Sequence, residues 1–161
     1  MNLIIIHQEC SEKHNGRLHR LYSNGSGIPS AGYVVLFDGY QTRSCTGNVA
    51  AHAGSCLMDL DTDRPILGYV NVCPGKLKIE YPENRYSLGI FTHEIAHALG
   101  AAKKHMKCAR LNGVDLENQK HRGPIGSHWE GKTYGNELMT GRIEVDYAVS
   151  NMTLGFFEDS G

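Results

Sequence analysis

The 161-residue chain lacks features that would place it in several large classes of protein. Its 16 basic and 17 acidic residues give a net charge of −1, so it has no global basic field of the kind that drives nucleic-acid binding. The longest apolar run near its start, Leu3–Ile6, is far shorter than the roughly 20 residues of a membrane helix. No segment has the order of an export signal. We therefore expect one domain with its own core, no nucleic-acid partner, and neither a transmembrane segment nor a signal peptide in this chain.

The cysteines lack the CxxC spacing that marks a zinc ribbon or a redox motif. They are Cys10, Cys45, Cys56, Cys73 and Cys108. Their wide spacing favours disulfides over thiolate metal ligands. Two glycosylation sequons, at Asn24 and Asn151, also point toward the oxidising secretory route. Because the cysteine count is odd, at least one thiol lacks a partner inside the chain, and the spacing does not fix the connectivity.

Short runs rich in β-branched or aromatic residues predict the strands. They lie at Leu3–His7, Tyr33–Phe37 and Ile66–Val72, the last of these after a turn-forming segment at Asp61–Pro65. Lys76–Glu80 is a candidate for a short edge strand. The sequence therefore predicts a small sheet in the first half of the chain.

Two helices are expected in the second half. The first covers about residues 87–99 and ends at Gly100, a natural C-terminal cap. The last covers Met152–Glu158, with Ser150 as its N-cap. Between them, residues 101–135 are polar and rich in glycine and charge, which predicts a loop with at most one short helix.

The stretch HEIAHALG, residues 93–100, is the strongest chemical signal. At about 100° per residue, His97 lies about 40° and Glu94 about 100° from His93 around the helix. Two imidazoles one turn apart can bind a single zinc ion, with the glutamate beside it. The opposite face carries the residues expected in the core: Leu88, Phe91, Ile95, Ala98 and Leu99.

A third ligand is missing from its usual place. In the common extended motif HExxHxxGxxH, the third histidine falls where this chain has Lys103, whose ammonium has no lone pair at neutral pH. The downstream candidates are His105, His121 and His128, or a glutamate such as Glu117 or Glu130. The residues alone leave these alternatives open.

Three motifs in order resemble the leishmanolysin family, a branch of the metzincins. HEIAHALG is followed by HWE at 128–130 and NELMTG at 136–141. In that family an insertion separates the glycine from the third zinc histidine, which precedes a tryptophan, and a methionine turn follows. DRPILGYVNVCP at 63–74 and TLGFFEDSG at 153–161 are also similar, so the resemblance covers most of residues 33–161.

The resemblance implies an α+β, metzincin-like zincin fold. A twisted mixed β-sheet would pack on the active-site helix, and a smaller C-terminal subdomain would carry the methionine turn. The chain would be one catalytic domain, with residues 1–100 as its upper part and 101–161 as its lower part.

The resemblance also implies the site. His93, His97 and His128 would bind one Zn²⁺ per chain, Glu94 would be the general acid and base, and Met139 would form the turn beneath the metal. Three neutral imidazoles leave the fourth zinc position open for a water, whose proton Glu94 can take.

Two further residues bear on this assignment. His105 follows the helix so closely that it could reach the metal only by a tight reversal through residues 101–104, which include no glycine or proline, whereas His128 follows a turn-rich approach at 123–126. Tyr134 is a candidate hydrogen-bond donor to a transition-state oxyanion, although a packing tyrosine would look the same in sequence.

The implied function is that of a zinc metalloendopeptidase acting on protein or peptide substrates. The alternative is a truncated paralogue, weak or inactive in catalysis, that acts as a cell-adhesion or protein-binding module. The presence of Glu94 and all three histidines favours the enzyme.

The sequence departs from the family pattern in having no pro-segment and no cysteine-rich C-terminal domain, and its insertion of 27 residues at 101–127 is short. We therefore expect a catalytic core or fragment, in which Cys108 is the cysteine that has lost its partner. The full-length form is expected to be secreted or membrane-associated, with any membrane contact made through regions outside this chain. A cytoplasmic fragment is the alternative.

Overall fold

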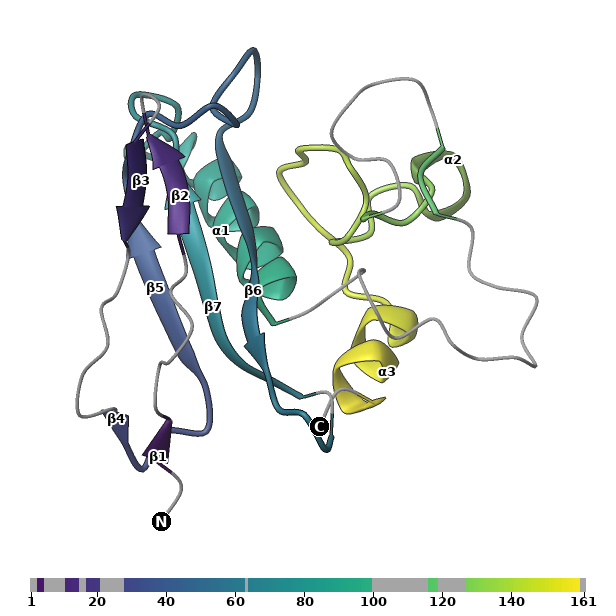
Figure 1. Cartoon of the computed structure of the whole chain (residues 1–161). Helices are drawn as coiled ribbons and strands as arrows, with labels where there is room; N and C mark the ends of the chain where they lie inside the picture. Colours follow the sequence, from purple (N-terminus) through teal and green to yellow (C-terminus); the bar gives the residue numbers. More distant parts are fainter. Residues whose placement is uncertain are drawn as a thin grey trace.

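The computed structural model describes residues 3–4, 11–14, 17–20, 28–62, 64–99, 116–118 and 127–159. Near the N-terminus, β1 (Leu3–Ile4) pairs antiparallel with β4 (Ile28–Pro29), and β2 (Ser11–His14) pairs antiparallel with β3 (Arg17–Arg20) (Figure 1). The strand expected at Leu3–His7 is present as β1, and its last three residues lie outside the described residues.

A three-stranded mixed sheet positions the site. Its order is β5 (Val34–Asp38), β7 (Pro65–Val72), β6 (Ala51–Met58), with β5 parallel and β6 antiparallel to β7. The predicted strands at Tyr33–Phe37 and Ile66–Val72 are confirmed to within one residue, as is the expectation of an α+β chain with a mixed sheet. Because β7 is the central strand, its side chains form the core of the sheet, where Leu67 and Val70 are fully buried.

Two expectations about strands differ from the structure. Strand β6 was not predicted, because its sequence AHAGSCLM is rich in small residues of low β propensity and is held in the sheet by pairing with β7. The strand expected at Lys76–Glu80 is wrong. The backbone of Lys78 bonds instead to the buried Ser87 hydroxyl, which accepts from its N–H at 2.8 Å and donates to its carbonyl at 2.6 Å.

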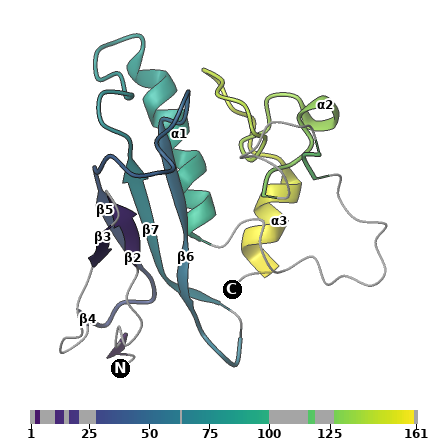
Figure 2. The same cartoon turned by 45° about the horizontal axis from the view of Figure 1, so that its top comes forward.

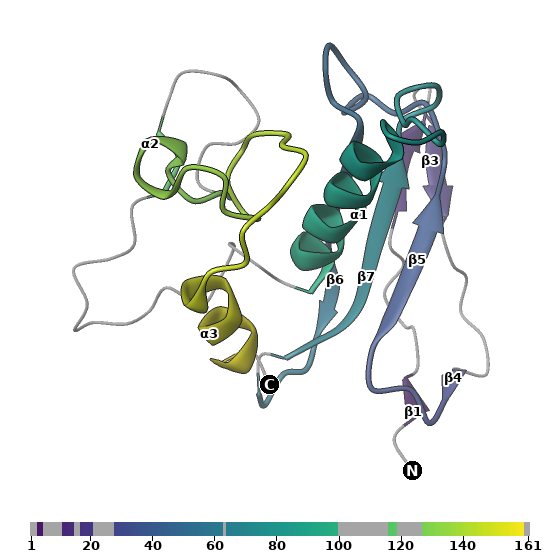
Figure 3. The same cartoon turned by 180° about the vertical axis from the view of Figure 1, so that it is seen from behind.

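Helix α1 (Asn84–Ala98) packs across β6 and β7 (Figure 3). It begins three residues before the expected Ser87 and has Leu99 as its C-cap, while Gly100 lies outside the described residues. The expectation that Leu88 faces the core is wrong, since 68% of this residue is exposed. One side of the helix packs on the sheet and another side contacts residues 127–159, so its buried arc includes the histidine side as well as the sheet side. Leu88 lies outside both.

Gly68 lets the end of α1 approach β7. A Cβ at this position would stand 2.1 Å from the Tyr33 hydroxyl and 2.8 Å from the Ala98 carbonyl oxygen. The Tyr33 hydroxyl donates a hydrogen bond to that same carbonyl. The C-terminal turn of the helix, which carries His97, is therefore fixed against the central strand.

The cysteines among the described residues, Cys45, Cys56 and Cys73, form disulfides, as predicted, and do not serve as thiolate metal ligands. Cys45, before β6, is bonded to Cys73, after β7, with a Cα–Cα distance of 5.5 Å. Cys56 is also disulfide-bonded. Cys10 and Cys108, including the expectation that Cys108 has lost its partner, lie outside the described residues.

The segment after α1 contains α2 (Gly131–Tyr134) and α3 (Asn151–Asp159). Helix α2 is the short helix expected within 101–135. The last helix is confirmed to within one residue at each end, and Ser150 caps it as predicted, because its Oγ accepts from the Thr153 N–H at 3.3 Å. Figures 1, 2 and 3 all place this segment beside α1, on the side of the sheet where β6 is the edge strand.

The core of this segment joins it to α1. Trp129, Leu138 and Met139 are buried together with Ala96 of the helix. Among the described helices, none is long and apolar enough to cross a membrane.

Candidate metal centre

One row of residues on α1 contacts the segment that follows the helix, residues 127–159. Positions four apart lie on the same face of a helix, and here each of four successive such positions contacts that segment. The pairs are Arg85 with Asp146, Gly89 with Tyr147, His93 with Leu138, and His97 with His128. The row therefore brings the two helix histidines to residues more than 30 positions later in the chain.

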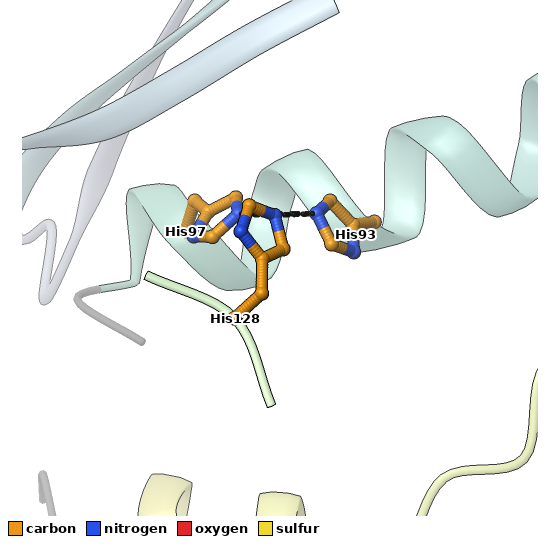
Figure 4. Close-up of side chains that lie close together, drawn as sticks. All are labelled: His93, His97 and His128. Atoms are coloured by element: carbon orange, nitrogen blue, oxygen red, sulfur yellow. Dashed lines mark hydrogen bonds between the residues drawn. The ribbon is translucent and has the colours of Figure 1, made fainter. Parts of the chain in front are cut away.

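The three histidines predicted to bind zinc lie together at the end of this row (Figure 4). Nε2 of His128 is 2.9 Å from Nε2 of His93 and 3.0 Å from Nε2 of His97. The two helix histidines have their Nε2 atoms 3.1 Å apart. Three ring nitrogens from two segments thus form a nearly equilateral triangle.

This donor set fits a zinc ion. Nδ1 of His93 lies 2.6 Å from the Leu138 carbonyl oxygen, so Nδ1 carries the proton and donates it, which leaves the lone pair on Nε2. Burial lowers the pKa of His93 to about 4, which keeps the ring neutral. Three nitrogens this close together can all lie about 2.0–2.1 Å, the Zn–N distance, from one point. Imidazole nitrogens that converge on one point in this way suit a divalent metal such as zinc.

Glu94 is buried beside these histidines. Only 8% of the residue is exposed, and its carboxylate accepts no hydrogen bond from the described residues. Burial raises the pKa of Glu94 to about 7. A buried carboxyl group with no partner and a pKa near neutrality has the properties of a general acid and base.

The four residues line a cleft of about 1080 Å³. Residues 51–55 of β6 form one side, and residues 140–143 with Tyr147 form the other. Because β6 is at the edge of the three-stranded sheet, one row of its backbone groups faces away from β7. The cleft therefore combines a strand edge with the candidate metal ligands.

The other two residues singled out from the sequence lie in the core next to the site. Met139 is 1% exposed, and its carbonyl oxygen accepts from the Trp129 N–H at 2.9 Å. Tyr134 packs against the cluster that contains Met139 and is not among the residues that line the cleft. Its role as an oxyanion donor stays a prediction that this packing does not favour.

The alternative third ligands are placed apart from the cluster. The Glu117 carboxylate accepts from the Gly131 N–H at 3.5 Å, and the Glu130 carboxylate accepts from the Lys132 N–H at 3.1 Å. Within the described residues, only the three histidines gather as a possible metal site. His105 and His121 lie outside the described residues.

Sequence reasoning missed two cleft residues. Tyr147 holds the cleft wall, because its hydroxyl accepts from the Glu144 N–H at 3.0 Å and donates to the Arg142 carbonyl at 2.9 Å. His52 of β6 has Nε2 2.9 Å from the Thr42 hydroxyl. Neither stands in a motif, and only the position of Tyr147 shortly after NELMTG hinted at a role.

Comparison with known proteins gives a consistent result. The sequence pattern of the leishmanolysin family matches residues 26–106 and 100–161. The leishmanolysin-like peptidase of Caenorhabditis briggsae is 24% identical over 210 residues, covering 85% of this chain and 32% of the relative. The leishmanolysin homolog of Crithidia fasciculata is 28% identical, covering 84% of this chain and 25% of the relative. The ciliated left-right organizer metallopeptidase of Xenopus laevis is 30% identical, covering 86% and 26%. The chain thus spans a third or less of the length of these relatives.

Proposed function

The chain belongs to the leishmanolysin family, and we propose that it is the catalytic part of a zinc metalloendopeptidase. The observation that carries this proposal is the convergence of three Nε2 atoms, 2.9–3.1 Å apart, beside the buried Glu94 carboxylate, which accepts no hydrogen bond from the described residues. His93, His97 and His128 hold one zinc ion, and the Met139 segment forms the turn that supports them.

The residues of the chain divide the chemistry between them. When bound, zinc supplies a Lewis acid that polarises a peptide carbonyl and lowers the pKa of a water to about 7. Glu94 takes the proton of the attacking water and then delivers it to the leaving amine. Its elevated pKa suits both steps, because a group that titrates near the working pH can accept and return a proton.

The substrate class follows from the cleft. An extended peptide can add to the outer edge of β6 through main-chain hydrogen bonds, which would hold it along the wall that faces the histidines. Such binding uses the backbone of the substrate, so we propose that proteins or peptides in extended form are the substrates.

The compartment is proposed from the disulfides. The Cys45–Cys73 bond and the bonded state of Cys56 support an oxidising environment, as in a secreted or surface-exposed protein. Any contact with a membrane would involve regions of a longer protein.

The test is the cleavage of an unfolded protein substrate with and without a zinc chelator, using two variants. In Glu94→Gln, we expect zinc to stay bound while hydrolysis falls by at least about 10²-fold, the low end for general acid–base groups. Glu130→Gln is the matched control, because Glu130 is also buried but does not line the cleft. It should retain activity.

Two outcomes would contradict the enzyme. Cleavage that survives both the chelator and Glu94→Gln would place the chemistry elsewhere. A parent chain that binds zinc and peptides without cleaving them would instead support the alternative, a protein-binding or adhesion module.

A further inference from the structure

A buried carboxylate lies behind the metal site and is not explained by the proposed chemistry. Glu137 is 3% exposed, and its carboxylate accepts hydrogen bonds from donors on three other residues. No lysine or arginine of the described chain pairs with it. Burying a carboxylate is costly unless its oxygens are satisfied, so this set of bonds indicates a specific task.

The first oxygen of Glu137 leads to His93. Oε2 accepts from the Met139 N–H at 2.6 Å, which closes a tight turn around Leu138. The carbonyl of Leu138 in turn accepts from Nδ1 of His93 at 2.6 Å. This carbonyl selects the His93 tautomer whose Nε2 is free for a metal, so the bond from Met139 to Glu137 fixes the group that orients the first ligand.

The second oxygen leads to the segment of His128. Oε1 accepts from the Thr153 hydroxyl at 2.5 Å, and that hydroxyl accepts from the indole Nε1–H of Trp129 at 2.9 Å. Trp129 follows His128 directly, and its backbone N–H donates to the Met139 carbonyl at 2.9 Å. Both sides of Trp129 are therefore tied to the turn that Glu137 closes.

The donors fit a carboxylate and not an amide. Oε1 also accepts from the Ser150 N–H at 3.3 Å and from the Ser150 hydroxyl at 3.0 Å, so each oxygen of Glu137 faces at least one backbone N–H. An ionised carboxylate has only acceptor sites and satisfies all of these donors. A glutamine would place its NH₂ group against one of the backbone N–H groups and leave it without an acceptor.

We propose that Glu137 is a positioning residue for the metal, which orients His93 through Leu138 and holds the His128 segment through Thr153 and Trp129. This inference rests on the proposed metal site and extends it from the three ligands to the group that joins two of them. The joined ligands come from positions 35 residues apart, so a single side chain couples the helix to the later segment.

The test is the dissociation constant for zinc, measured by chelator competition on folded protein. Glu137→Ala and Glu137→Gln should each weaken zinc binding by about 10–100-fold, the usual effect of removing a partner behind a ligand. Cobalt-substituted protein should show an altered visible spectrum in both variants, because the ligand geometry changes.

Ser87→Ala is the matched control. Ser87 is also buried and lies on the same helix as His93. Its replacement by alanine removes two hydrogen bonds to the Lys78 backbone, neither of which leads to a metal ligand. It should lower the unfolding temperature and leave the zinc dissociation constant and the cobalt spectrum unchanged. If zinc affinity is unchanged in the Glu137 variants, or falls equally in Ser87→Ala, Glu137 has only a structural role and the proposal is wrong.

Thr153→Val decides the matter if neither Glu137 variant folds. This variant removes the link from Glu137 to Trp129 but keeps the hydrogen bond from the Met139 N–H to Glu137. Zinc binding should therefore weaken by up to about 10-fold, and unchanged binding would overturn the proposal.

If the parent chain binds no zinc, the metal site itself fails. The ¹⁵N resonances of His93 in the metal-free chain then test Glu137, with protonated Nδ1 expected in the parent and in Thr153→Val, which keeps the Met139 bond, and mixed tautomers expected in Glu137→Gln. The parent tautomer in Glu137→Gln, or mixed tautomers in Thr153→Val, would contradict the proposal.

Discussion

The ring of Tyr147 lies against the backbone of Gly89, so close that a Cβ at position 89 would stand 2.4 Å from Cε2 of the ring. Tyr147 also lines the cleft, and its hydroxyl is held by the backbone of residues 142 and 144. The absence of a side chain at position 89 therefore allows the cleft wall to lie directly on helix α1, one turn before His93.

A methyl group at position 89 should displace that wall. Alanine normally stabilises a helix relative to glycine by about 0.5–1 kcal/mol, but in Gly89→Ala the clash with Tyr147 should dominate and destabilise the fold by about 1–3 kcal/mol. Gly155→Ala, in α3, is the control, since nothing lies within 4 Å of its added Cβ. Urea unfolding of both variants measures the difference.

Gly155→Ala should be neutral or slightly stabilising, while Gly89→Ala should also raise the KM for a peptide substrate. Equal stability of the two variants would mean that the Tyr147 ring moves aside at little cost, and that the contact does not hold the wall.

The Cys45–Cys73 disulfide closes a loop across the β6–β7 pair. Its sequence separation is 28 residues, and cross-links of this loop length typically stabilise a fold by about 2–4 kcal/mol. The double variant Cys45→Ser, Cys73→Ser should lose about that much in urea unfolding. A loss below about 1 kcal/mol would mean that the sheet alone orders the loop before β6.

His52 should make the stability of the metal-free chain depend on pH. Burial lowers the pKa of His52 below its ordinary value of 6.5, so the folded state favours the neutral ring. The stabilisation is complete above about pH 6.5 and is lost as the pH falls from there through the lower folded-state pKa.

The comparison is between the parent and His52→Gln, unfolded in urea at about pH 7.5 and about pH 5.5. The parent should lose more stability between these two values than the variant, because glutamine does not titrate. The same loss in both proteins would show that His52 titrates alike in the folded and unfolded states.

The elements with strong local signals could be predicted from the sequence. Strands β5 and β7 are rich in β-branched residues, and α1 carries the HExxH spacing, so each was found with small errors at its ends. The cap at Ser150 was found for the same reason, because its side chain acts within its own helix.

The features that depend on distant contacts could not be predicted. Strand β6 has little β propensity of its own and exists because β7 pairs with it. Thr153 stands in a glycosylation sequon, yet it is 1% exposed and its hydroxyl is bonded between Trp129 and Glu137. In the sequence, nothing distinguishes Glu137 from another polar residue near Met139. Its proposed role depends on hydrogen-bond donors from residues 139, 150 and 153, which only the fold brings to it.

The most direct test of the account is a zinc titration of the parent chain, His128→Ala and His105→Ala, with peptide hydrolysis measured in parallel. The parent should bind one zinc. His128→Ala should lose most of the bound zinc and all activity, because it removes one corner of the Nε2 triangle. His105→Ala should retain both. Full zinc binding and activity in His128→Ala, or their loss in His105→Ala, would contradict the proposed metal centre and the function derived from it.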